Sequence, residues 1–176
     1  MKMCGILAYI SNKEISPKKQ LIIKNLMKSR GPDNQAYKKL SFGKKNLHLF
    51  HSRLSILDLN KRSNQPYYFK NYVMIFNGEI YNFKYLKDKI NHNNKFNTLS
   101  DTEVILYYYD LYKDKCFKYF EGMWSLIIYD LNNEKIIVSR DRFGEKPLFV
   151  YKDKDEIIFS SQINYINAII ENSSKF

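Results

Sequence analysis

The chain has 176 residues, of which 44% are hydrophobic and 16% aromatic, which is enough apolar material for the core of one domain. No stretch approaches the roughly 18 uninterrupted apolar residues of a membrane helix, and the start lacks the apolar segment and cleavage site of a secretory signal. We therefore expect a cytoplasmic protein with no membrane contact.

The basic charge is spread along the chain. Lysine and arginine number 29 against 18 aspartate and glutamate residues, which gives a net charge of +11. The excess is mostly lysine, in pairs rather than in long basic runs, so we expect it to favour solubility and weak attraction of anions, with no nucleic-acid partner. A basic nucleic-acid-binding module stays open as an alternative, and its affinity would fall steeply with salt concentration.

The two cysteines and three histidines do not form a metal-binding pattern. Cys4 and Cys116 lack a Cys-x-x-Cys spacing, and His48, His51 and His92 are not spaced as metal ligands. Cys116 lies between aromatic residues, which favours a small buried side chain. Cys4 lies almost at the start of the chain, before a glycine and a short apolar run, where it could serve packing or chemistry.

The first elements in chain order are a strand and a helix. Residues 5–10 (GILAYI) form a short apolar run that predicts a buried strand. Ser16 is a favourable N-cap, Pro17 suits the first helical position, and the apolar residues that follow have helical spacing. We expect this helix to end at Gly31-Pro32.

The middle of the chain predicts strands followed by two helices. Residues 46–57 (NLHLFHSRLSIL) alternate enough for a strand that ends near Arg53. In residues 72–82 (YVMIFNGEIYN), two β-rich arms flank an Asn-Gly dipeptide, which predicts a hairpin turn. Residues 83–90 suggest a short helix, and residues 100–103 (SDTE) predict a capping box that opens a second one.

The last third of the chain predicts four strands, and the elements together indicate an α+β fold. The strands are expected over residues 123–130, 135–140, 146–151 and 156–161. Helices in the middle with strands on both sides suggest a four-layer αββα sandwich of two antiparallel sheets. From Gln162 onward we expect the chain to be weakly helical and then frayed.

Seven motifs occur in an order that is similar to that of one known family. They are MCGI, SRGPD, HSRLSILDL, NGEIYN, SDTEVIL, FEGMWSLIIYD and SRDRFGEKPLF. Together they resemble the glutaminase domain of class II glutamine amidotransferases. The LSILD segment after the His-x-Arg triplet is most similar to the asparagine synthetase branch. The resemblance covers residues 3–165, with residues 166–176 as a frayed tail, and it implies the N-terminal nucleophile hydrolase fold.

The resemblance implies a role for the thiol of Cys4. In this family the initiator methionine is removed and the cysteine becomes the first residue. Its own α-amino group, with a pKa of about 7.7–8.0, then acts as the base for the thiol. Here Met1 and Lys2 precede Met3, and Lys2 is too large for ordinary methionine removal, so we expect translation to begin at Met3. The alternative is that Cys4 only packs as a small hydrophobic residue.

The resemblance also implies the groups that bind glutamine. Arg53 would bind the α-carboxylate and Asp101 the α-ammonium, although a surface ion pair and a favourable charge in the first turn of a helix are the ordinary alternatives. Asn77 and Gly78 would donate hydrogen bonds to the oxyanion that forms on the amide, in which case their backbone is not an ordinary hairpin turn. The other expected substrate contacts are Leu54, Ser55, Ile56, Leu57 and Glu79.

Two further motifs favour structural roles. We expect Arg30 and Asp33 to brace the loop that carries the nucleophile. We expect Arg140 and Asp141 to form a buried ion pair or to face a partner domain. No catalytic step is assigned to these four residues.

The implied reaction is hydrolysis of L-glutamine to glutamate and ammonia through a thioester on Cys4, with no metal or organic cofactor at this site. In full-length relatives a synthetase domain with a Gly-rich SGGxDS loop uses ATP and Mg to activate the ammonia acceptor, and this sequence has no such loop. We therefore expect a fragment, a truncated product or a subunit that docks on a separate synthetase. Two alternatives stay open: an amidotransferase domain for another acceptor, such as a sugar or antibiotic precursor, and a non-catalytic interaction domain if Cys4 is not N-terminal.

Overall fold

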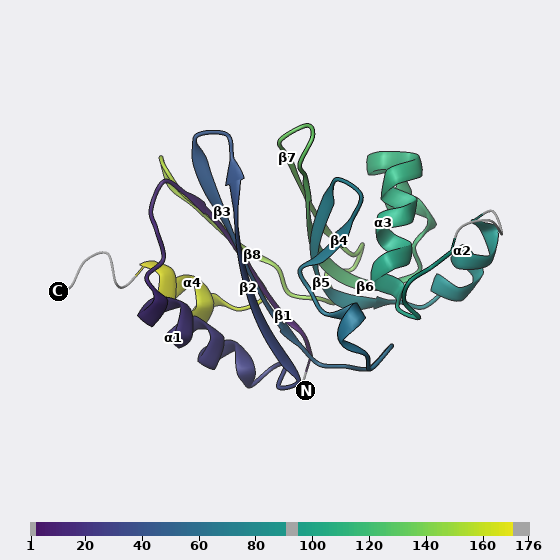
Figure 1. Ribbon diagram of the computed structural model, residues 1–176, viewed down its shortest axis with the longest axis horizontal. Helices are drawn as coiled ribbons and strands as arrows, with labels where there is room; N and C mark the ends of the chain where they lie inside the picture. Colours follow the sequence, from purple (N-terminus) through teal and green to yellow (C-terminus); the bar gives the residue numbers. More distant parts are fainter. Residues whose placement is uncertain (1–2, 91–94, 171–176) are drawn as a thin grey trace.

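Two antiparallel sheets lie face to face in the middle of the molecule, and helices cover both outer faces (Figure 1). This computed structural model describes residues 3–90 and 95–170. The five-stranded sheet has the spatial order β2 (Asn34–Phe42), β3 (Lys45–Arg53), β1 (Gly5–Ser11), β9 (Ile157–Ser160) and β8 (Phe149–Lys152). The four-stranded sheet has the order β4 (Tyr67–Phe69), β5 (Tyr72–Ile80), β6 (Gly122–Asp130) and β7 (Lys135–Arg140).

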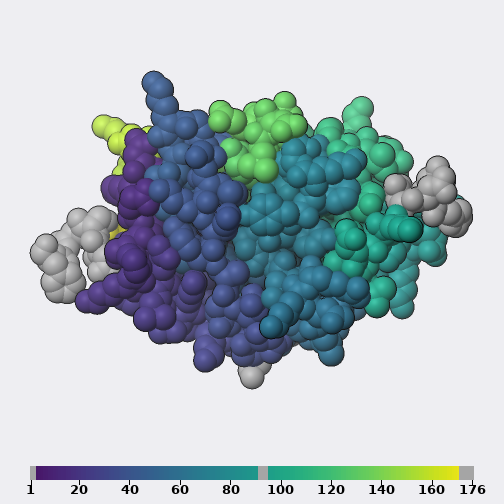
Figure 2. Space-filling model, in the orientation of Figure 1, coloured from purple at the N-terminus to yellow at the C-terminus, as the bar shows by residue number. Residues whose placement is uncertain are grey.

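The helices complete the predicted order of layers, αββα. Helices α1 (Pro17–Lys28) and α4 (Ile163–Ile170) cover the five-stranded sheet, and α2 (Phe83–Lys89) and α3 (Asp101–Tyr112) cover the four-stranded sheet (Figure 1). In the space-filling view, segments of the two sheets adjoin along one face of the molecule (Figure 2). Within the described ranges, no helix is long and apolar enough to cross a membrane.

Three apolar clusters join the four layers. On the central strand β1, Ile6, Ala8 and Ile10 face the other sheet, whereas Leu7 and Tyr9 face the helices. A strand that is buried on both faces needs apolar residues at consecutive positions, which explains the unbroken run GILAYI. Burying such surface contributes about 25 cal/mol per Å² of apolar area, so the clusters hold the layers in register.

Helix α1 forms as its sequence predicts, and α4 is longer than expected. The side chain of Ser16 accepts a hydrogen bond from the backbone N–H of Lys19, with Pro17 in the first turn. Helix α4 continues to Ile170, beyond residue 165, and Ile166 is buried against the five-stranded sheet. Residues 171–176 lie outside the described part of the chain.

The sequence did not predict strands β2 and β4. Strand β2 is the edge of its sheet, and its residues are only half-buried or exposed, so it lacks an apolar alternation. Strand β4 is also an edge strand and has three residues, which is too short for a recognisable period. The predicted strand at 146–151 begins only at Phe149.

The hairpin predicted at Asn77-Gly78 is wrong. Both residues lie inside the continuous strand β5, where Asn77 is opposite Ser125 and Gly78 opposite Trp124. A Cβ atom on Gly78 would lie 2.2 Å from the carbonyl O of Met123, which is closer than atoms can approach. The glycine is therefore required by the close approach of β6 and not by a turn.

The capping box predicted at the start of α3 is also wrong. Ser100 occupies the N-cap position, but its side chain makes no cap hydrogen bond. The Glu103 carboxylate accepts instead from the backbone N–H groups of Asn97, at 2.9 Å, and Thr98, at 2.7 Å. Glu103 thus holds the loop before the helix, and this loop leads directly into Asp101.

Candidate active site

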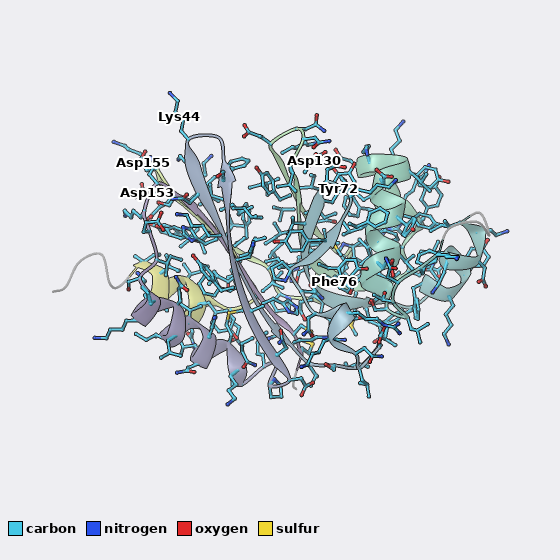
Figure 3. All side chains as sticks on the ribbon, viewed as in Figure 1. Lys44, Tyr72, Phe76, Asp130, Asp153 and Asp155 are labelled. Carbon is cyan, nitrogen blue, oxygen red and sulfur yellow. The ribbon has the colours of Figure 1, made fainter. Side chains whose placement is uncertain are left out.

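A pocket of about 180 Å³ opens where the ends of several elements meet. Antiparallel pairing of β1 with β3 places Gly5 opposite Ser52, so the residue before β1 lies beside the end of β3. Along β5, Tyr72 lies at the end away from the N-terminus and Phe76 nearer to it, so β5 runs toward the same end of the sheets (Figure 3). The predicted site residues that line the pocket are Cys4, Arg53, Leu54, Ile56, Leu57, Asn77, Gly78, Glu79 and Asp101.

The thiol of Cys4 lies against the start of the loop that follows β3. The backbone N–H of Leu54 donates to Sγ at 3.4 Å, and Sγ lies 3.6 Å from the carbonyl O of Leu54. Burial raises the pKa of the thiol, and the hydrogen bond from Leu54 and the charge of Arg53 oppose this rise only in part. The thiol is therefore protonated near neutral pH and needs a base before it can attack.

Arg30 and Asp33 brace the segments on both sides of the thiol. The Arg30 side chain donates from Nε to the carbonyl O of Cys4 at 3.1 Å, and the Arg30 carbonyl accepts from the backbone N–H of Met3 at 3.1 Å. The Asp33 carboxylate accepts from the backbone N–H of Ser55 at 2.6 Å. Ser55 is the one predicted substrate contact that does not line the pocket, and its backbone is bound to Asp33 instead.

Asn77 presents a buried amide group to the pocket. Its side chain is 1% exposed, and its Nδ2 has no hydrogen-bond partner among the residues that the structure describes. A buried donor without a partner costs roughly 1–3 kcal/mol, so such groups are rare unless a ligand completes them. Together with Gly78 on the same strand, this amide can donate to an oxygen atom placed next to Cys4.

Asp101 supplies a buried carboxylate at the first residue of α3. The side chain is 4% exposed, and its Oδ2 accepts from the backbone N–H of Ile80 at 3.0 Å. Burial raises its pKa to about 6, and hydrogen bonds from the N–H groups of Ile80 and Thr102 oppose the rise in part. The carboxylate is thus ionised near pH 7 and has no ion-pair partner in the described part of the chain, which favours binding of a cation in the pocket.

Arg53 is held by the loop that follows it. Its guanidinium donates to the carbonyl O of Asn60 at 2.9 Å and to the side chain of Asn64 at 2.8 Å. It also donates to the carbonyl groups of Leu57, at 3.1 Å, and Asp58. No carboxylate forms an ion pair with Arg53 in the described ranges, so its positive charge in the pocket is not neutralised by the protein.

The sequence did not single out Asp58, which ties two pocket loops together. Its carboxylate accepts from the backbone N–H of Leu99 at 2.8 Å, across 41 positions of sequence. It also accepts from Asn60, through both its backbone and its side chain, and from Arg62 at 2.9 Å. Asp58 has a φ of 46°, a conformation that a non-glycine residue adopts rarely. It therefore connects the loop that holds Arg53 with the loop that leads to Asp101.

Arg140 and Asp141 do not form the expected ion pair. The Asp141 carboxylate accepts backbone N–H groups from four residues, which lowers the pKa of this carboxyl group. Arg140 donates to the carbonyl groups of Gly144 and Lys146. The two side chains thus shape the loop 141–148, and this loop places Lys146 in the pocket.

The histidines are not arranged as metal ligands in the part of the chain that the structure covers. No group of His, Cys, Asp and Glu residues there could hold a metal ion. His51 lies between the sheets with its Nε2 3.2 Å from the carbonyl O of Phe76, and burial lowers its pKa to about 3. His48 contacts Tyr37 on the neighbouring strand. His92 lies outside the described residues.

The chemistry of the pocket follows from four groups. It contains the thiol of Cys4, the amide of Asn77, the ionised carboxylate of Asp101 and the guanidinium of Arg53. Among the described residues the amide Nδ2 has no hydrogen-bond partner and the guanidinium has no ion-pair partner. A small zwitterion can place its two charged ends on the guanidinium and the carboxylate. The thiol of Cys4 and the amide of Asn77 line the same pocket as these two charged groups.

Comparisons with known proteins agree with this chemistry. Residues 3–175 match the family model described as a glutamine amidotransferase domain. The chain is 36% identical to a Methanocaldococcus jannaschii protein named as a glutamine-hydrolysing asparagine synthetase, over 98% of this chain and 36% of that protein. It is 38% identical to glutamine-hydrolysing asparagine synthetase 2 of Bacillus subtilis, over 92% of this chain and 22% of that protein.

The fold is similar to that of a solved structure of an amidotransferase. Glutamine phosphoribosylpyrophosphate amidotransferase of B. subtilis superimposes with a TM-score of 0.71 at 17% identity, over 94% of this chain and 43% of that chain. The predicted N-terminal nucleophile hydrolase fold is thereby confirmed. The chain spans about a third or less of the length of the two asparagine synthetases.

Proposed function

Because the chain belongs to the glutamine amidotransferase domain family, we propose that it hydrolyses L-glutamine to glutamate and ammonia at the pocket around Cys4. The observation that carries this proposal is the buried Nδ2 of Asn77, which has no partner in the described structure and shares the pocket with the thiol. An amide donor held in this way serves a developing oxyanion, which a simple interaction domain would not require.

The two charged ends of glutamine select its orientation. The α-carboxylate binds at Arg53, whose guanidinium is fixed by the loop carbonyls and forms no ion pair with a carboxylate of residues 3–90 and 95–170. The α-ammonium binds at Asp101, and its charge favours the ionised form of that carboxyl group. The side-chain amide then extends toward Cys4 and the end of β5.

The reaction proceeds through a thioester. The α-amino group of a Cys4 that begins the chain accepts the thiol proton while Sγ bonds to the amide carbon, and the oxyanion receives hydrogen bonds from Asn77 and Gly78. The carbon–nitrogen bond then breaks, and the ammonium of Cys4 returns the proton to the departing ammonia. Water attacks the resulting γ-glutamyl thioester by the same proton route, which releases glutamate and regenerates the thiol. Only groups of the chain and water take part in these steps, without a metal or organic cofactor.

The ammonia serves a synthetase partner. The asparagine synthetases that match this chain are much longer than it, so most of each relative lies outside the matched region. We assign the use of ATP and Mg, and the activation of an aspartate-type acceptor, to such a domain or subunit. This chain supplies the ammonia.

Ammonia release from L-glutamine tests the proposal. The protein is prepared with Cys4 as its first residue, and ammonia is measured with and without the substitution Cys4→Ala. Cys116→Ala is the matched control, because Cys116 is buried outside the pocket. We expect activity in the wild type and in Cys116→Ala and none in Cys4→Ala. Activity that survives Cys4→Ala would overturn the proposal. A wild type that releases no ammonia would also overturn it and would favour an interaction domain.

A further inference from the structure

Lys146 is a buried cation in the pocket that the proposed reaction does not use. Lys146 is only 4% exposed, and it lines the pocket with Cys4. No carboxylate lies within ion-pair distance of its Nζ in the described part of the molecule. A lysine is seldom buried without an acidic partner, so its position calls for a functional reason.

The backbone around Lys146 fixes its place. Its N–H donates to the Asp141 carboxylate at 3.0 Å, and its carbonyl accepts from the Arg140 side chain at 2.6 Å. The side chain therefore extends from a loop that is bound at both sides. The Nζ of Lys146 donates a hydrogen bond to the Sδ atom of Met3 at 2.8 Å.

Met3, whose sulfur atom contacts Lys146, is the residue whose removal creates the catalytic base. The backbone N–H of Met3 donates to Arg30, and the carbonyl of Cys4 accepts from the same arginine, so both residues are anchored. When the peptide bond between Met3 and Cys4 is cut, Lys146 loses the sulfur atom as its acceptor. The nitrogen atom of Cys4 becomes a free amine, directly after the residue that Lys146 contacted in the chain.

We propose that Lys146 is a positioning residue that keeps the α-amino group of the mature Cys4 uncharged, so that this amine can accept the thiol proton. The inference rests on the proposed function. Two amines in one desolvated pocket do not both carry a proton easily, because like charges repel strongly where water is scarce. The α-amine, with an ordinary pKa of about 7.7–8.0 against about 10.4 for lysine, loses its proton first.

Other charged groups near Lys146 and Cys4 either raise or lower the pKa of Lys146. Arg30, which contacts Cys4 directly, adds to the repulsion and also lowers the pKa of Lys146, although burial is the larger cause. The pKa of Lys146 is raised in turn by the negative charges of Glu145, Glu79 and Asp141. Asp101 and Arg53 face the thiol of Cys4 from α3 and from the end of β3.

The Asp141 carboxylate already accepts four backbone N–H groups, and Glu145 and Glu79 form no ion pair in the described ranges. These acids therefore offset part of the charge of Lys146 without forming an ion pair with it in the described ranges. Lys146 is the cation whose Nζ contacts the side chain directly before the Cys4 amine in the chain.

The substitution Lys146→Met tests this role, since it keeps the length and apolar stem of the side chain and removes the charge. Lys146→Arg restores the charge, and Lys152→Met on the exposed strand β8 is the matched control. All proteins begin at Cys4. Two quantities are measured: the pH dependence of kcat/KM for ammonia release, and the pKa of the Cys4 amine by NMR of ¹⁵N-labelled cysteine.

We expect the acid limb of the pH profile and the NMR pKa of the amine to rise together by about one unit in Lys146→Met. Both should stay near the wild-type values in Lys146→Arg and Lys152→Met. An amine pKa that does not change in Lys146→Met overturns the inference. If Lys146→Met does not fold, Lys146→Gln undergoes the same two measurements with the same outcomes. A wild type without ammonia release would overturn the proposed function, whereas the NMR titration still decides the role of Lys146.

Discussion

At the scale of single residues, the site is marked by polar groups that the fold buries but does not pair. Asn77 leaves Nδ2 without a partner among the residues that the structure describes, and the buried carboxylate of Asp101 accepts from the backbone N–H of Ile80. Folding alone would not retain such groups, because each costs free energy in the empty protein. Their cost is offset only when a substrate with matching charges and dipoles enters.

Asn77→Ala tests the oxyanion contact. Removing one such donor lowers kcat by about 10²–10³, while KM changes little because the bond strengthens only in the transition state. Steady-state ammonia release measures both constants, and Asn132→Ala in the exposed turn after β6 is the control. A kcat within threefold of the wild type would contradict the assignment of this amide.

Asp101→Asn tests the buried carboxylate through stability. The carboxyl group has a pKa of about 6 in the folded protein against an ordinary value of 3.8, so the folded state binds its proton more tightly than the unfolded chain does. Its destabilising effect is absent below pH 3.8, grows as the pH rises to about 6 and is constant above that.

We therefore expect Asp101→Asn to become more stable relative to the wild type by on the order of 2–3 kcal/mol between pH 4 and pH 7. Urea unfolding at both pH values measures this difference. If the difference in the free energy of unfolding between the two proteins is the same at pH 4 and pH 7, the carboxyl group has an ordinary pKa in the folded state.

At the scale of elements, strand pairing and one acidic side chain assemble the site. The pairing of Gly5 with Ser52 brings the residue before β1 to the end of β3, although 48 positions separate Cys4 from Ser52 in the sequence. The loop between β3 and β4 contains a 3-10 helix, Lys61–Ser63, and Asp58 joins this loop to the loop before α3 through Leu99. The arrangement of Arg53 relative to Asp101 therefore depends on this carboxylate as well as on β3 and on Ile80 of β5, whose backbone N–H donates to Asp101.

Asp58→Ala tests this connection. The substitution removes hydrogen bonds to three residues and frees the loop whose carbonyls hold Arg53, so glutamine binding weakens more than the chemical step. We expect KM for glutamine to rise about tenfold or more with kcat changed less. Asp155→Ala on the exposed β8–β9 turn is the control, and an unchanged KM would show that the loops hold their places without Asp58.

At the scale of the whole molecule, most of the layers could be predicted from the sequence. Tertiary contacts do not override a strong local signal. Such signals are the apolar run of β1, the Ser16-Pro17 start of α1 and the apolar strands around β6. The edge strands β2 and β4 carry no such signal, because they bury little of their surface. The Asn-Gly hairpin failed because the close approach of Met123 to Gly78 is a contact between strands that are distant in sequence.

The site was predicted from the order of motifs and not from local patterns. Seven motifs in register placed Cys4, Arg53, Asn77 and Asp101 together, and they do line one pocket. The roles of Asp58 and Lys146 depend on loop conformations that no period or spacing encodes. The same holds for Ser55, which lies in a predicted motif but does not line the pocket.

The central claim is that Cys4 attacks glutamine only when its own amine is free, and trapping the acyl-enzyme tests it most directly. The protein that begins at Cys4, and the same protein retaining Met3, are mixed with L-glutamine, quenched rapidly with acid and examined by mass spectrometry of their peptides. We predict a γ-glutamyl group on the Cys4 peptide of the first protein alone. Ammonia release without that group on Cys4, or equal acylation of the protein that retains Met3, would contradict the account.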